Sequence, residues 1–258
     1  MSDDALAQAE DRAEALLTEL DIELPEHIDV ALIAAHLGVF VRAAPLRDEE
    51  ANLVRSPGLG LVTLADRVRG SHKQSFVLAH EVGHFVLHRD LDDARRCAPL
   101  RTFGKAGAQS REVEAREAEA SAFASALVLP RAMIARACAT EQPDLALLSA
   151  LADRHRVSLS VAALRFVALT PAACAVVWSE RACVVWRRRS TAFSFDVRVG
   201  HSIGGAAYAR LCAAGESAPR GLLPVDPRAW GGPSSAEAEL FEESRGGRSG
   251  TLTWLWHP

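Results

Sequence analysis

His80-Glu81-Val82-Gly83-His84 is the stretch of the chain that decides its fold. Residues four apart on a helix project from the same side, so His80 and His84 would offer two parallel imidazoles, with Glu81 beside them. Imidazole nitrogens bind zinc at about 2.0–2.1 Å, and a neighbouring carboxylate can serve as a general base. The spacing therefore predicts a helix that carries two zinc ligands and a catalytic carboxylate. A chance occurrence of the pattern is the alternative.

The residues on either side of the motif extend the same helix, which we expect over Ser75 to His88. Its histidines and Glu81 share one stripe, and an otherwise apolar helix of this kind is normally buried. An unpaired polar side chain in a buried place costs about 1–3 kcal/mol, and a metal ion would satisfy the two histidines. His88 is the weaker candidate for a ligand and is expected in the core or beside the site. The apolar positions are Phe76, Leu78, Ala79, Val82, Phe85, Val86 and Leu87.

A third ligand is expected on a second long helix, from about Arg111 to Leu129. Glu117 shares its face with small residues that would let this helix pack closely against the first. Glu119 lies on a nearly opposite, more mixed face. Glu117 is therefore the expected ligand and Glu119 the alternative, while Ser121 could support the site from one turn beyond. The face of Glu117 holds Val113, Ala120, Ser121, Ala124 and Val128.

Two histidines and one carboxylate leave the fourth position of a zinc ion to water, as in catalytic sites. Zinc lowers the pKa of such a water to about 7 and polarises a carbonyl group. Glu81 would take the proton of the water and return it to a leaving amine. The residues therefore predict zinc-dependent hydrolysis of a peptide bond.

Composition limits the other classes of function. The 258 residues are long enough for two domains, which we favour. No apolar run approaches the roughly 18 residues of a membrane span, and we expect no membrane partner. A formal charge of −4 and a pI near 6.1 give no electrostatic reason to expect direct binding of nucleic acid.

The cysteines and the start of the chain bear on its compartment. The 5 cysteines are scattered and never spaced as Cys-x-x-Cys, which argues against a disulfide framework or a thiolate zinc site. The acidic start, Met1-Ser2-Asp3-Asp4, is not followed by the apolar stretch of a secretory signal. We therefore expect the protein in the cytosol.

The rest of the first 170 residues predicts helices and a small antiparallel sheet. Apolar spacing indicates opening helices over Asp4 to Leu20 and His27 to Leu37, and two short helices within Leu145 to Leu169. Pro130 ends the long second helix, because proline lacks the amide that a helix interior uses. The expected strands are Val39 to Arg42, Ala51 to Arg55 and Gly60 to Leu64.

The pattern changes after Thr170-Pro171, where we expect a small α/β domain. Its expected strands are Ala173 to Trp178, Ala182 to Arg187 and Thr251 to Trp256, and Ser244 to Gly250 is expected as a loop. Its aromatic residues could line a ligand pocket, although core packing in the sheet is the favoured interpretation. These residues are Trp178, Trp186, Trp254 and Trp256.

Three segments together resemble a known family. They are Ser75 to His88 (SFVLAHEVGHFVLH), Glu117 to Ala124 (EAEASAFA) and Leu127 to Pro130 (LVLP). The chain is similar here to the M78 metallopeptidases, the ImmA/IrrE group, over roughly residues 5 to 170. The resemblance implies an α+β fold: a mainly helical, zincin-like catalytic domain over 1–140, a helical extension over 141–170 and the small domain over 171–258, likened in some members to a GAF sensor.

The family pattern assigns the zinc ligands to His80, His84 and Glu117 and the general base to Glu81. Its members cleave helix-turn-helix repressors in bacteria during stress or mobile-element responses, so the resemblance implies Zn2+ as cofactor and such a repressor as the protein partner. The family usually has asparagine where this chain has Ser121. It also usually has basic residues before the helix, where this chain has Lys73-Gln74-Ser75.

Two competing functions come from other classes. Leu148 to Leu169 could form a DNA-binding helix-turn-helix with Ser158 or Ser160 as a cap and Arg165 on the recognition helix. The neighbours of Arg165 are apolar or small, however, and favour packing. A metal- or ligand-sensing regulator without peptidase activity is the second alternative. Glu81 argues against it, because metal binding alone does not require a carboxylate beside the ligands.

Overall fold

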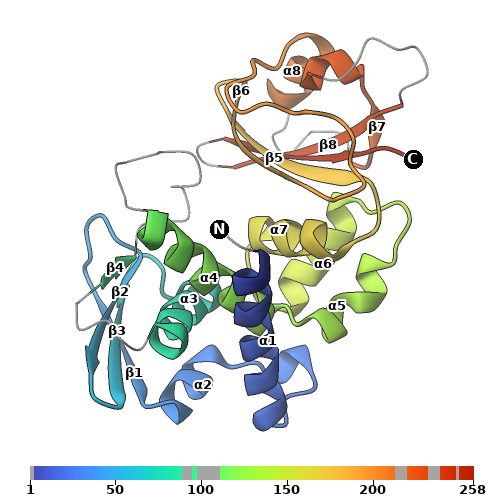
Figure 1. Ribbon diagram of the computed structural model, residues 1–258. Helices are drawn as coiled ribbons and strands as arrows, with labels where there is room; N and C mark the ends of the chain where they lie inside the picture. Colours follow the sequence, from blue (N-terminus) through green and yellow to red (C-terminus); the bar gives the residue numbers. More distant parts are fainter. Residues whose placement is uncertain (1–2, 89–94, 98–110, 213–219, 232–238, 248–249) are drawn as a thin grey trace. The chain divides into compact units, whose positions relative to one another are not determined.

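The computed structural model describes residues 3–88, 95–97, 111–212, 220–231, 239–247 and 250–258 (Figure 1). The chain divides into two compact units, each described here by itself. Unit 1 comprises Met1–Met133 and Ala152–Val161, and unit 2 comprises Ile134–Leu151 and Ala162–Pro258. The α+β class expected from the sequence is confirmed, since helices dominate the first part of the chain and strands the last.

Helices build most of the described residues up to 169, and they lie close to the expected segments except for η1 and α5, which the sequence did not predict. In α1 the buried residues Ala9, Ala13, Leu16 and Leu17 recur at helical spacing, and this stripe packs against α4. The helices are α1 (Asp3–Glu19), η1 (Pro25–His27), α2 (Val30–His36), α3 (Gln74–Leu87), α4 (Arg111–Val128), α5 (Arg131–Cys138), α6 (Leu145–Arg154) and α7 (Leu159–Leu169).

The sheet of unit 1 has the strand order β1-β3-β2-β4, with β1 (Val39–Ala44), β2 (Ala51–Ser56), β3 (Leu59–Ala65) and β4 (Arg95–Cys97). Strand β2 is antiparallel to β3, as expected, and also to β4, a strand that the sequence did not predict. The pairing of β1 with β3 is parallel, which corrects the expectation of an all-antiparallel sheet. The tight turn after β2 fixes β3 as its antiparallel partner, and β1 joins the free side of β3 rather than β2.

Helix α3 lies between this sheet and α4 (Figure 1). Gly60 in β3 lets the helix approach closely, because a Cβ added there would lie 3.1 Å from Cδ2 of Phe85. The inner face of the sheet is completed by buried side chains such as Leu53 and Val62, which oppose one another across β2 and β3. Helix α3 is therefore enclosed on both sides.

Unit 2 contains a five-stranded antiparallel sheet in the order β6-β5-β9-β8-β7. The expected hairpin and last strand are present, whereas Ser244 to Gly246, expected in a loop, belong to β8. The elements are β5 (Cys174–Glu180), β6 (Cys183–Arg189), α8 (Gly205–Cys212), β7 (Leu223–Pro224), η3 (Pro227–Trp230), β8 (Phe241–Gly246) and β9 (Thr251–Trp256).

The aromatic residues of unit 2 are partly core residues. Trp254 is fully buried, its indole Nε1 donates to the carbonyl oxygen of Pro143 at 2.7 Å, and its ring meets Phe166 edge-on. Trp178 and Trp186 stack across the β5–β6 pair. Core packing, the favoured interpretation, thus holds for Trp254.

The segment Leu148 to Leu169, considered above as a DNA-binding helix-turn-helix, buries its key basic residue instead of exposing it. Ser158 caps α7 by accepting from the amide of Val161 at 3.3 Å, as expected. Arg165 is only 2% exposed, so its guanidinium is not available to a DNA phosphate.

Across the described residues no single helix has the length and apolarity of a membrane span, although the bent pair α4 and α5 passes that test jointly.

Candidate metal centre

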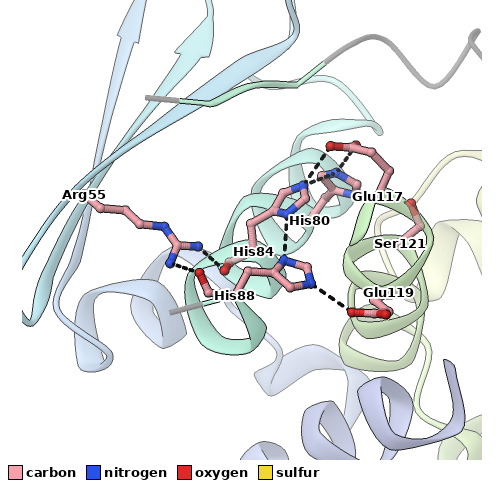
Figure 2. Close-up of polar contacts among 7 residues, drawn as sticks. All are labelled: Arg55, His80, His84, His88, Glu117, Glu119 and Ser121. Carbon is pink, nitrogen blue, oxygen red and sulfur yellow. Dashed lines mark hydrogen bonds and ion pairs between the residues drawn. The ribbon is translucent and has the colours of Figure 1, made fainter. Parts of the chain in front are cut away.

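Helix α3 places the three polar residues of the motif in the interior. His80 is 5% exposed, His84 is 2% exposed and Glu81 is fully buried. From α4, the carboxylate of Glu117 reaches both histidines: Oε2 lies 3.2 Å from Nε2 of His80, and Oε1 lies 3.3 Å from Nε2 of His84 (Figure 2). The two Nε2 atoms are 3.1 Å apart.

This cluster has the composition and the spacing of a metal site. His80, His84 and Glu117 each offer one ligand atom, and these atoms lie within 4.8 Å of one another. Ligands at about 2.0–2.1 Å from a tetrahedral zinc ion are roughly 3.3 Å apart, which is close to the separations found here. Three electron-rich atoms at such distances repel one another unless a proton or a cation lies among them. The residues therefore fit a divalent cation.

The protonation of the cluster also suits a cation, because ligands must be deprotonated to bind one. Burial lowers the pKa of His84 to about 4, so its imidazole is neutral at pH 7. Burial raises the pKa of Glu117, but hydrogen bonds from His80 and His84 outweigh this effect and hold the pKa well below its usual range. Glu117 is thus a charged carboxylate facing two imidazoles.

Gly83 brings the two helices together at this point. A Cβ at Gly83 would lie 3.1 Å from the carbonyl oxygen of Ala120 and 3.1 Å from Cδ1 of Phe123. The absence of a side chain therefore allows α4 to approach α3 closely enough for Glu117 to reach the histidines.

The neighbours of the cluster are residues that the sequence singled out for weaker or supporting roles. Ser121 Oγ lies 3.3 Å from Nδ1 of His80, in the supporting place expected for it. Glu119, the alternative ligand, instead lies beside His88, with Oε2 3.0 Å from Nε2. Burial lowers the pKa of His88, with the hydrogen bond to Glu119 opposing this shift. His88 lies one turn beyond His84 on α3, whereas Glu119 lies two residues after Glu117 on another face of α4, so only the packing of the two helices brings this pair together.

Arg55 holds the end of α3 from the neighbouring strand β2. Its Nη1 donates to the carbonyl oxygen of His88 at 2.6 Å, and its Nη2 donates to the carbonyl oxygen of His84 (Figure 2). The guanidinium also lies over the ring of Phe85, 5.6 Å from its centroid. A cation near the C-terminal carbonyl groups of a helix stabilises the helix. The local sequence of β2 does not predict that Arg55 makes this contact.

Comparison with known proteins places the chain in a family. The protein-family model Peptidase_M78, described as IrrE N-terminal-like domain, matches residues 34–167, which is more than half of the chain and includes the whole cluster. No curated protein matches. A solved structure described as "Mycobacterium tuberculosis transcriptional regulator" is similar with a TM-score of 0.60 and 17% identity over 97% of this chain and 87% of that one, a likeness of fold. The chain belongs to the Peptidase_M78 family.

Proposed function

We propose that the protein is a zinc-dependent endopeptidase. The observation that carries the proposal is the group of His80, His84 and Glu117, whose ligand atoms lie within 4.8 Å of one another beside the fully buried Glu81. These three residues would hold the ion. Zinc, when bound, polarises the carbonyl of a peptide bond and lowers the pKa of a water to about 7.

Glu81 is the general base in this proposal. One of its carboxylate oxygens takes a proton from the attacking water and passes it to the nitrogen of the leaving amine. Its position next to His80 on α3 supports this role, because both side chains leave the same turn of one rigid helix. Membership of a peptidase family supports the same reaction class.

The proposed substrate is a helix-turn-helix repressor in the cytosol, cleaved in a stress or mobile-element response. This part rests on the resemblance of the motifs to the ImmA/IrrE group. The similar structure described as a transcriptional regulator is compatible with it, although that description applies to the other protein. The burial of Arg165 removes the basic side chain of α7 from any DNA contact, which favours a protein target.

The metal is tested first, by mass spectrometry of the purified protein. We expect about one zinc per chain in the wild type and little in His80→Ala or Glu117→Ala, because each loses one of three ligands. Glu114→Gln, an exposed position on the same helix, is the matched control and should keep its zinc. A wild-type protein that binds no zinc, even when zinc is supplied, would contradict the proposal.

Cleavage is tested with Glu81→Gln. This variant should retain zinc but lose roughly 10²–10⁴-fold in rate, since it keeps the ligands and removes the base. Purified helix-turn-helix repressors from the source organism would be incubated with each protein, and new chain ends mapped by mass spectrometry. Equal cleavage by Glu81→Gln would show that Glu81 is not the base. Zinc binding without cleavage of any repressor would favour the regulator alternative.

A further inference from the structure

A line of polar contacts runs away from the metal cluster, from His84 through His88 to Glu119 (Figure 2). Nδ1 of His84 lies 3.0 Å from Nδ1 of His88, and Nε2 of His88 lies 3.0 Å from Oε2 of Glu119. His84 is 2% exposed and His88 is 9% exposed, so solvent does not readily replace these partners. Neither His88 nor Glu119 belongs to the group of three ligand atoms.

With a cation at the cluster and both imidazoles neutral, one arrangement of protons satisfies every contact in this line. If Nε2 of His84 faces the ion, its proton is on Nδ1 and is donated to the lone pair of Nδ1 in His88. The proton of His88 is then on Nε2, where it is donated to the carboxylate of Glu119. The reverse arrangement puts the proton of His84 on Nε2, towards the ion, and leaves an unprotonated nitrogen of His88 against a carboxylate.

We propose that His88 and Glu119 are positioning residues for the metal ligand His84. They fix its imidazole in the Nδ1-protonated tautomer and turn Nε2 towards His80 and Glu117. The inference rests on the metal site of the proposed function and adds two residues to it. A carboxylate that orients a ligand histidine raises its basicity as a ligand, and here a second histidine lies between the two.

The backbone of the same turn is fixed independently, which makes the side-chain contacts effective. Arg55 takes no part in the side-chain contacts that join His84, His88 and Glu119. Its guanidinium donates to the carbonyl oxygens of His84 and His88. Because both the backbone and the ring of His84 are held, little freedom remains for its imidazole to lose when an ion binds. The other ligand histidine has a simpler partner, the hydroxyl of Ser121, 3.3 Å from Nδ1 of His80.

The test measures the zinc dissociation constant of the full chain by competition with a chromophoric chelator. His88→Phe removes both contacts, and Glu119→Leu removes the final acceptor. Each should weaken zinc binding by about 10–100-fold while leaving one zinc per chain. His88→Gln and Glu119→Gln keep an amide oxygen or nitrogen in place and should recover most of the affinity. Glu114→Gln on the exposed side of α4 is the control and should bind as the wild type does.

A second readout reports the tautomers directly. In ¹⁵N NMR of the zinc-loaded wild type near pH 7, His84 should be protonated at Nδ1 and His88 at Nε2. The thermal midpoint of each metal-free variant is recorded beside the affinity, so that a folding defect is recognised. If His88→Phe does not fold, the pair Glu119→Leu and Glu119→Gln decides, because Glu119 is more exposed than His88.

The outcomes separate the two proposals. A wild type that binds no zinc overturns the metal site itself. A wild type that binds zinc, with folded His88→Phe and Glu119→Leu proteins that bind it equally well, overturns the positioning role alone. Two zinc ions in the wild type and one in His88→Phe would also overturn it, because His88 would then be a ligand.

Discussion

At the scale of single residues, Gly83 couples the packing of two helices to the geometry of the cluster. The atoms that a Cβ would meet include the carbonyl oxygen of Ala120, which belongs to the backbone and cannot rotate away. Glu117 lies one turn before Ala120 on the same helix. A displacement of α4 at Gly83 therefore moves a candidate ligand.

Gly83→Ala should lower the free energy of unfolding by about 1–3 kcal/mol, as expected for overpacking in a tight core, and weaken zinc binding at the same time. Urea unfolding and chelator competition measure the two effects. Gly204→Ala is the control, because a Cβ there has nothing within 4 Å. Unchanged stability together with unchanged affinity would show that α4 adjusts without cost.

His155 gives the stability of unit 1 a dependence on pH. Its Nδ1 donates to the carbonyl oxygen of Val128 at 2.8 Å, while within the described part of the chain its Nε2 is buried without a hydrogen-bond partner. Burial lowers the pKa of His155 below its ordinary value of 6.5. The unfolded chain therefore takes up the proton first as the pH falls.

The stabilising contribution of neutral His155 is complete above pH 6.5 and is lost as the pH falls from there towards the lower folded pKa. His155→Gln, which does not titrate, should therefore make unfolding free energy fall less steeply between pH 7 and 5, by up to about 1.4 kcal/mol per pH unit. Urea unfolding across this range is the measurement, with exposed His36→Gln as control. An identical slope in wild type and His155→Gln would contradict the assignment.

The sequence could predict that His80, His84 and Glu117 lie together. It could not predict that Glu119 contacts His88. Helical spacing alone distinguishes the face of Glu117 from that of Glu119, and the structure brings Glu117 to His80 and His84. The pairing of Glu119 with His88 depends on how α4 is rotated against α3, which no local pattern encodes. Their roles as ligands and positioning residues stay proposals until metal is measured.

At the scale of elements, α3 is held by contacts from β2 as well as by its own hydrogen bonds. Arg55→Ala should cost about 1–3 kcal/mol of unfolding free energy, because two helix-end carbonyls lose a charged donor. Urea unfolding measures the loss, and exposed Arg69→Ala should change stability by less than about 0.5 kcal/mol. Equal stabilities of these two variants would mean that water replaces the guanidinium.

Helices with clear periodicity and strands with β-branched runs could be located from sequence, whereas the strand order and the strands β4, β7 and β8 could not. The parallel partnership of β1 with β3 is decided by which edge of the β2–β3 pair is free. Strand β8 contains Glu242 and Glu243, both buried. Glu242 accepts from Trp230 and Glu243 accepts from the amide of Leu145, partners too distant in sequence for a local pattern to reveal.

At the scale of the whole molecule, unit 2 joins the last sheet to helical segments that precede it. Trp254 in β9 donates to Pro143 and packs on Phe166, and Glu243 in β8 accepts from the amide of Leu145. These contacts cover apolar side chains of residues 134–151 and 162–170 with strands from the segment 171–258 of the same unit. The limits expected at 140 and 170 stay a prediction about which segments fold alone.

A chain cut after Thr170 should therefore unfold at a lower temperature than the full chain and self-associate, because residues such as Phe166 lose their cover. Differential scanning fluorimetry and size-exclusion chromatography are the measurements. Trp254→Phe is the milder companion, which removes the indole hydrogen bond and part of the buried ring. A monomeric, equally stable 1–170 fragment would instead support the domain limit at residue 170.

Because each unit is made of two separate stretches of chain, the polypeptide passes between them at residues 133–134, 151–152 and 161–162. A single recombination event joins one upstream stretch to one downstream stretch. No single crossover in the gene can therefore exchange one unit and leave the other intact. We therefore expect the two units to be inherited together. New substrate specificity would then arise by substitutions within the chain and not by the exchange of one unit.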